Sequence, residues 1–175
     1  MKYLKLIPLF LLFIFASCSG VRVVTDYDRE ANFETYSSFA FFKPGIDKAE
    51  ISDLDKKRIL RAVESSLAEK GMNKFSNPDL LVSIFTKESE RVDVYNNNFG
   101  WGGGFGWGGG WGNTASTTTE GTLYIDFIDA KTKELVWQGI GRSSLYRGSD
   151  IDKKDKRIRL IVSEILIEYP PVLEK

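Results

Sequence analysis

The sequence of 175 residues contains no histidine and only one cysteine, Cys18. Without histidine, Ser-His-Asp triads, Cys-His dyads and nearly all catalytic zinc sites are excluded. One cysteine allows no intramolecular disulfide, so the thiol requires another explanation. A charge excess is also missing, because 24 Lys and Arg balance 24 Asp and Glu. With no basic stripe to displace counterions, we expect no nucleic-acid partner, and nothing in the sequence indicates a cofactor.

The N-terminus supplies a reason for the lone thiol. Lys2 and Lys5 precede an apolar run from Leu6 to Phe15 of ten residues. A bilayer span takes about 20 residues, so this run fits the core of a signal peptide instead. The following Ala16-Ser17-Cys18 resembles the lipobox of bacterial lipoproteins, with Phe15 where Leu is usual.

We therefore predict a signal peptide over residues 1–17 and a lipid on Cys18 that supplies at least two acyl chains, enough for stable membrane anchoring. The alternative is an ordinary signal peptide with Cys18 as a bystander thiol. Ser19 is not the Asp that tends to retain lipoproteins at the inner membrane. We accordingly expect an outer-membrane lipoprotein that faces the periplasm.

Hydrophobic periodicity after residue 18 predicts one α+β domain over residues 33–175, preceded by a polar tether over 18–32 in which 21–24 could form a short strand. The expected fold is a mostly antiparallel sheet of four to five strands with two helices packed on one face. The predicted strands cover residues 33–42, 80–87 with a possible extension to 95, 119–130 and 135–146. The predicted helices cover residues 52–70 and 150–169. Their apolar stripes are Ile59, Ala62, Val63 and Leu67 in the first and Ile158, Ile161, Val162, Ile165 and Leu166 in the second. Turns are expected at Pro44-Gly45 and at Pro78, where Asp79 would cap or orient the turn. Trp137 is expected in the seam between the sheet and the helices.

Both helices have recognisable ends. Ser52 followed by Asp55 resembles a capping box, and Gly71 lies where a C-terminal residue needs positive φ. Acidic residues at the start of the second helix favour its dipole, and Pro170 ends it. These acids, Asp150, Asp152 and Asp155, do not match a calcium loop, because the required glycine and final glutamate are missing. No metal site is predicted.

The segment from Phe99 to Gly112 consists of nine glycines and five aromatic residues. Because glycine loses the most backbone entropy on ordering, we expect a long loop over residues 96–119 between two central strands. Its aromatic side chains could stack on sugars, enter a membrane interface or contact a partner. The alternative is a low-complexity expansion without function. The candidate contact residues are Phe99, Trp101, Phe105, Trp107 and Trp111.

Several segments, taken in order, resemble the lipoproteins that carry domain of unknown function 4136. They are Asp26-Tyr27-Asp28 with residues 33–41, Asn77 to Val82, Gly121 to Ala130, Leu135 to Gly139 and Ile165 to Pro171. Phe42 stands near a position where the family pattern has Trp. The resemblance implies an exported lipoprotein with a compact α+β domain, and it implies no established activity and no catalytic residues.

Three functional hypotheses follow. The first is a non-catalytic interaction or accessory module, held at the membrane by the lipid on Cys18 and in contact with an envelope protein. The second is a glycan or cell-wall binder that uses Trp101, Trp107 and Trp111. The third is a hydrolase with an acidic site. The sequence does not exclude a pair of catalytic carboxylates, but it does not indicate which two of the 24 acids would form it. We expect the protein not to be an enzyme.

Overall fold

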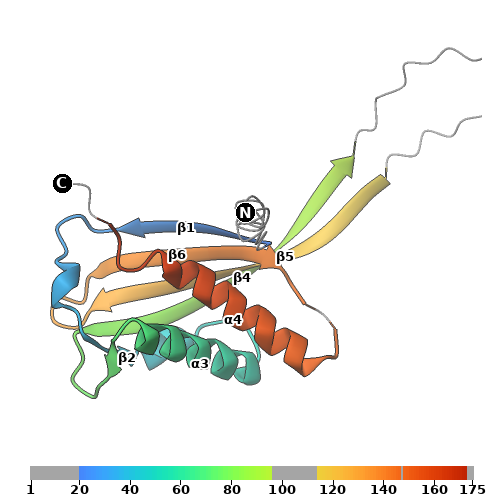
Figure 1. Ribbon diagram of the computed structural model, residues 1–175. Helices are drawn as coiled ribbons and strands as arrows, with labels where there is room; N and C mark the ends of the chain where they lie inside the picture. The colour runs from blue at the N-terminus through green and yellow to red at the C-terminus, as the bar shows by residue number, and fades with distance from the viewer. Residues whose placement is uncertain (1–19, 96–113, 147, 173–175) are drawn as a thin grey trace, which may run out of the picture.

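The computed structural model describes residues 20–95, 114–146 and 148–172. Six strands form one sheet in the order β1-β6-β5-β4-β2-β3, and two long helices, α3 and α4, lie against one face of it (Figure 1). The strands are β1 Val21–Tyr27, β2 Ser38–Phe41, β3 Asn73–Lys74, β4 Leu80–Tyr95, β5 Thr114–Asp129 and β6 Leu135–Ser144. The helices are η3 Phe33–Thr35, α2 Lys43–Ile46, α3 Asp53–Glu69 and α4 Ile151–Ile167.

Both predicted long helices are confirmed, and so is the predicted cap at Ser52; Asp150, predicted only to favour the dipole of the second helix, caps that helix. The Ser52 hydroxyl accepts a hydrogen bond from the Asp55 N–H at 3.2 Å, and the Asp150 carboxylate accepts one from the Lys153 N–H at 3.0 Å. Gly71 ends the first helix with φ +82°, a conformation that glycine adopts without strain. The predicted apolar stripes are buried at their centres, as at Val63 in α3.

The three central strands are the elements that sequence periodicity describes best. β4 pairs with β5 and β5 pairs with β6, both antiparallel, as predicted for these consecutive strands. On β5, Leu123, Ile125 and Phe127 are buried under the helices. The predicted extension of the strand from residue 80 to Tyr95 is confirmed.

The sheet differs from the prediction in its number of strands and in its mixed direction. β2 pairs with β4 in parallel, because the chain between them crosses over through α3. Residues 21–27, predicted mainly as tether, form a strand that pairs with β6 along its whole length. The predicted strand over 33–42 is partly wrong, since the Asn32 side chain accepts the Glu34 N–H and turns the chain into the short helix η3 before β2.

Two predicted irregular segments are also partly ordered. The turn expected at Pro44-Gly45 is the four-residue helix α2, with Pro44 in its first turn. Residues 114–119, expected as part of a loop over 96–119, belong to β5 and pair with residues 90–95 of β4. Residues 96–113 lie outside the described residues.

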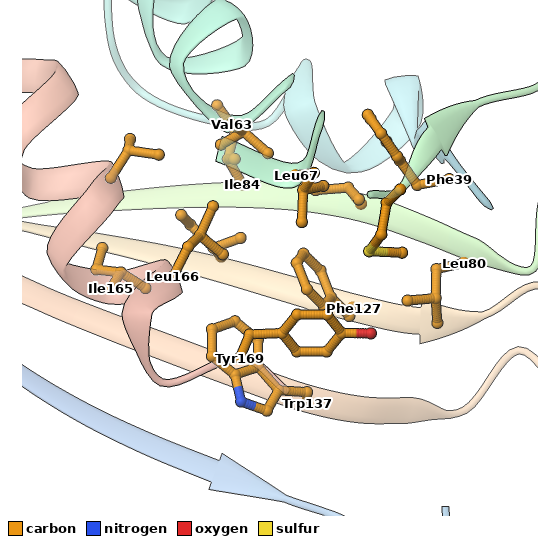
Figure 2. Close-up of a cluster of buried hydrophobic side chains, with 14 of the residues drawn as sticks. Phe39, Val63, Leu67, Leu80, Ile84, Phe127, Trp137, Ile165, Leu166 and Tyr169 are labelled. Atoms are coloured by element: carbon orange, nitrogen blue, oxygen red, sulfur yellow. The ribbon is translucent and has the colours of Figure 1, made fainter. Parts of the chain in front are cut away.

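The core centres on aromatic side chains between the sheet and the helices (Figure 2). Trp137 is fully buried, with its ring centroid 4.9 Å from that of Phe127 and 5.4 Å from that of Tyr169. Gly139 lets Trp137 and α4 approach, because a Cβ there would lie 2.4 Å from Ile165 Cγ2. The predicted placement of Trp137 in the seam between sheet and helices is therefore confirmed.

Candidate functional site

The first described residue, Gly20, lies at one end of the domain, together with the start of α4 and the base of a two-stranded arm. The Arg157 guanidinium in α4 donates a hydrogen bond to the Gly20 carbonyl at 3.3 Å, directly before β1. Arg22 in β1 forms an ion pair of 2.7 Å with Glu120, the first residue of β5 that pairs with β6. These contacts fix Gly20 at this end. Cys18, the predicted lipidation site, lies outside the described residues.

The arm consists of the parts of β4 and β5 that extend past β6. Backbone pairing continues from Glu90↔Thr119 to Tyr95↔Thr114, and the arm projects from the body of the domain (Figure 1). Residues 96–113 therefore begin and end at the far end of the arm. The five predicted contact residues belong to this segment and lie outside the described part of the chain: Phe99, Trp101, Phe105, Trp107 and Trp111.

An apolar pocket lies at the base of the arm, between the N-terminal halves of α3 and α4 and the sheet. Its volume is about 140 Å³. Sequence periodicity predicted Ile158 and Ile161 as part of the buried stripe of α4, but both are only half-buried and line this pocket. Its apolar walls come from four segments distant in sequence: Ile51, Ile59, Leu123, Leu145, Ile158 and Ile161.

Charged side chains surround the pocket. Asp55 joins the two helices, since its carboxylate contacts Lys154 Nζ at 2.9 Å and Arg58 Nη1 at 2.7 Å. Burial would raise the pKa of Asp55, but the hydrogen bonds from Lys154, Ser52 and Arg58 outweigh it and hold the pKa below its usual value. Arg157 also donates a hydrogen bond to the buried Ser143 hydroxyl.

The sheet face opposite α3 and α4, which we call the outer face, bears a row of apolar side chains. By strand register, Phe85, Tyr124, Ile140 and Val24 are neighbours across four strands. The Phe85 and Tyr124 rings have centroids 5.6 Å apart. Phe85 is 45% exposed and Val24 61%, so the two ends of the row are open to solvent.

Asp126 lies in the next row of the outer face, and Gln138 Nε2 donates to its carboxylate at 2.7 Å. Burial raises the pKa of Asp126, and the bond from Gln138 offsets this in part. Asp126 shares an open hollow with Glu50 and Glu88, yet neither of them contributes to its pKa shift.

Within the residues that the structure describes, no group of three or more Cys, Asp or Glu side chains is arranged to hold a metal ion. No helix in the same ranges has the length and apolar character needed to cross a membrane.

No pattern in the sequence indicates the pocket. Ile51 precedes α3, Leu145 follows β6, and Arg157 looks like one of several basic residues on an amphipathic helix. No motif connects these positions, because the pocket exists only where α3, α4 and the end of the sheet meet. Ile158 and Ile161 are recognisable in the sequence only as members of the apolar stripe of α4. Periodicity does not distinguish a half-buried position from a buried one.

Comparisons with known proteins agree with the fold. The sequence model described as "Domain of unknown function (DUF4136)" matches residues 23–171, and no functionally curated protein matches the chain. A PDZ domain protein from Parabacteroides distasonis has a similar structure, with TM-score 0.52, 16% identity and coverage of 89% of this chain and 36% of that one. The chain thus spans about a third of that protein's length.

The PelC dodecamer from Paraburkholderia phytofirmans is also similar to this chain. Its TM-score is 0.47 at 12% identity, covering 83% of this chain and 95% of that one. A second crystal form, of a PelC variant, has a TM-score of 0.43 at 10% identity.

Proposed function

This chain belongs to the family of the domain of unknown function DUF4136, and from that membership we propose that it is a lipid-anchored protein of the cell envelope. In this proposal the lipid is attached to Cys18 and the domain acts as a non-catalytic interaction module. Its location is the outer membrane, facing the periplasm, because Ser19 does not match the inner-membrane retention signal. The partner in this proposal is an envelope protein.

The observation that supports the proposal is the short separation in sequence between Cys18 and β1. Gly20 is already held by Arg157, and β1 starts at Val21. Two residues span at most about 7 Å, so a lipid on Cys18 would hold this end of the domain close to the bilayer. A tether of this length would orient the domain, because the start of α4 and the base of the arm would face the same surface.

The mature N-terminus gives the direct test. Mass spectrometry of the protein from membranes should find an N-terminal Cys18 that carries diacylglycerol, and globomycin should cause the unprocessed form to accumulate. Cys18→Ser should remove the lipid and release the protein from the membrane fraction, whereas the neighbouring change Ser19→Ala should leave both unchanged. A mature protein that begins at another residue and carries no fatty acid would contradict the proposal.

A second candidate function is binding of cell-wall glycan by the aromatic residues between β4 and β5. The arm supports it, because a segment attached to Tyr95 and Thr114 starts beyond the part of the sheet in which β5 pairs with β6. Aromatic rings that extend from a scaffold can stack on sugar rings. The candidate residues remain Phe99, Trp101, Phe105, Trp107 and Trp111.

Triple replacement of Trp101, Trp107 and Trp111 by Ala should abolish sedimentation with purified peptidoglycan. The matched control is Phe75→Ala, which removes an exposed aromatic ring from the opposite end of the domain, next to β3. Circular dichroism should show the same fold in all three proteins. Unchanged sedimentation of the triple variant would exclude this function.

A further inference from the structure

We propose that the apolar pocket at the base of the arm binds an unbranched carboxylic acid of the fatty-acid class. The hydrocarbon tail lies between α3, α4 and the sheet, and the carboxylate lies against the Arg157 guanidinium. This inference goes beyond the proposed function and does not depend on lipidation of Cys18.

The walls of the pocket define the tail. They are formed by four isoleucines and two leucines, and all of these residues belong to the apolar lining described above. The volume of about 140 Å³ is close to that of a dry engineered cavity of about 150 Å³ that holds benzene. About six carbon atoms of a ligand therefore fit inside. A longer chain would extend from the opening into solvent.

Arg157 defines the head group. Its Nη2 donates to the Gly20 carbonyl and to the Ser143 hydroxyl, so the guanidinium is held in place at the pocket. The other donors, on Nε and Nη1, make no hydrogen bond within the described residues. A guanidinium binds a carboxylate through parallel hydrogen bonds of high strength and specificity.

Arg157 differs in its pairing from Lys154 and Arg159, two other cations of α4. Lys154 pairs with Asp55, and Arg159 pairs with Asp155 at 2.7 Å. Arg157 has no carboxylate partner within the part of the chain that the structure describes. Its charge is available for an anionic ligand, whereas Lys154 and Arg159 each contact a carboxylate, which in the case of Asp55 is shared with Arg58. An apolar cavity beside an unneutralised, pre-positioned guanidinium matches the two halves of a fatty acid.

The first test uses the full chain with Cys18→Ser. This variant carries no thioether-linked lipid, and its pocket residues are unchanged. Octanoate, octanol and octylamine are titrated by calorimetry, and isoleucine methyl signals are followed by NMR. Octanoate should bind at least about tenfold more tightly than octylamine and should shift the methyl signals of Ile51, Ile59, Ile158 and Ile161. Affinity should rise about fourfold per methylene from butanoate to hexanoate and level off once the tail fills the pocket.

The second test separates charge from packing. Arg157→Gln should weaken octanoate binding at least about tenfold, while Arg159→Gln, a matched change two residues further along α4, should alter it less than twofold. Ile158→Trp should fill the pocket and remove binding with the circular dichroism spectrum unchanged. If Arg157→Gln fails to fold, the ligand series on the unaltered pocket decides. Equal binding of octylamine and octanoate, or unshifted isoleucine methyl signals at saturating octanoate, would overturn the proposal.

Discussion

Trp137 combines the largest buried side chain with an unsatisfied polar atom. Its ring lies against Phe127 and Tyr169, which gives it extensive contact in the core. Its Nε1–H is buried and has no hydrogen-bond partner among the described residues. The side chain therefore stabilises the fold by its volume while its N–H group opposes folding.

Two replacements of Trp137 separate these effects. Trp137→Ala should lower the free energy of unfolding by about 3–5 kcal/mol, because it leaves a large cavity. Trp137→Phe should cost only about 1–2 kcal/mol, since removal of the unpaired N–H offsets part of the lost contact. Urea unfolding measures both values. Equal losses for the two variants would show that the N–H does not oppose folding.

Asp79 holds the start of β2 against β4. Its carboxylate accepts hydrogen bonds from the Ser37 N–H at 3.1 Å, the Ser38 N–H at 3.0 Å and the Ser38 hydroxyl at 2.6 Å. The sequence predicts only that Asp79 caps or orients the adjacent turn at Pro78, and no pattern connects Asp79 with Ser37 or Ser38. The hydroxyl of Ser38, followed by the backbone of Ser37, holds the pKa of Asp79 below its usual value.

The direction of this pKa change predicts the pH dependence of stability. A lowered pKa in the folded state stabilises the protein above the unfolded pKa, and this contribution is lost as pH falls through the folded pKa. Asp79→Asn should therefore cost about 1–2 kcal/mol at pH 7, and the difference from wild type should shrink in acid.

Asp126→Asn is the matched control with the opposite sign. Burial raises the pKa of Asp126, so its contribution to stability is present at low pH and is lost as pH rises through the folded pKa. At pH 7 this variant should be at least as stable as wild type. Thermal unfolding at several pH values measures both variants, and parallel curves would contradict the assignment.

At the scale of elements, the two long helices are specified at their first turns. Ser52 and Asp150 each adopt extended backbone and accept the N–H of the residue three positions later. The first turn of a helix has N–H groups without intrahelical partners, and a capping side chain satisfies one of them. These contacts form within a few residues, which is why sequence analysis located both helix starts to within one residue.

Each cap should be measurable on its own. Ser52→Ala and Asp150→Ala should each lower the free energy of unfolding by about 1 kcal/mol. Asp152→Ala removes a carboxylate from the first turn of α4 without removing the cap, and it should cost less than Asp150→Ala. Chemical denaturation gives these differences. An equal cost for Asp150→Ala and Asp152→Ala would assign the effect to the helix dipole and not to the cap.

The whole molecule consists of a two-layer body and a two-stranded arm. In the body, β5 lies between β4 and β6 and its inner face is covered by helices. In the arm, β4 and β5 pair only with each other (Figure 1). A two-stranded ribbon alone is marginally stable in water, whereas additional strands and a packed face increase stability.

Hydrogen exchange should reveal this division. The amides of Val82, Ile84 and Ile125 should exchange only through global unfolding, because their strands have buried apolar contacts. The amides of Val94 and Ala115 in the arm should exchange faster by several orders of magnitude. Heteronuclear NMR or mass spectrometry measures the rates, and uniform protection along β4 would contradict the division.

Local sequence patterns were enough to predict the helix boundaries, the alternation of β5, the burial of Trp137 and a glycine–aromatic segment between β4 and β5. These features depend on residues within a few positions of one another, through periodicity, capping and backbone entropy. Three features are visible only in the tertiary structure. Residues 21–27 form an edge strand, β2 runs parallel to β4, and the Asp79 carboxylate accepts hydrogen bonds from Ser38.

The pocket likewise required the tertiary structure. Its walls come from segments far apart in the chain. Among the described residues, Lys154 and Arg159 have carboxylate partners and Arg157 has none, and the sequence does not indicate this difference. A side chain's neighbours across a fold depend on strand pairing and helix packing, which local sequence patterns do not encode.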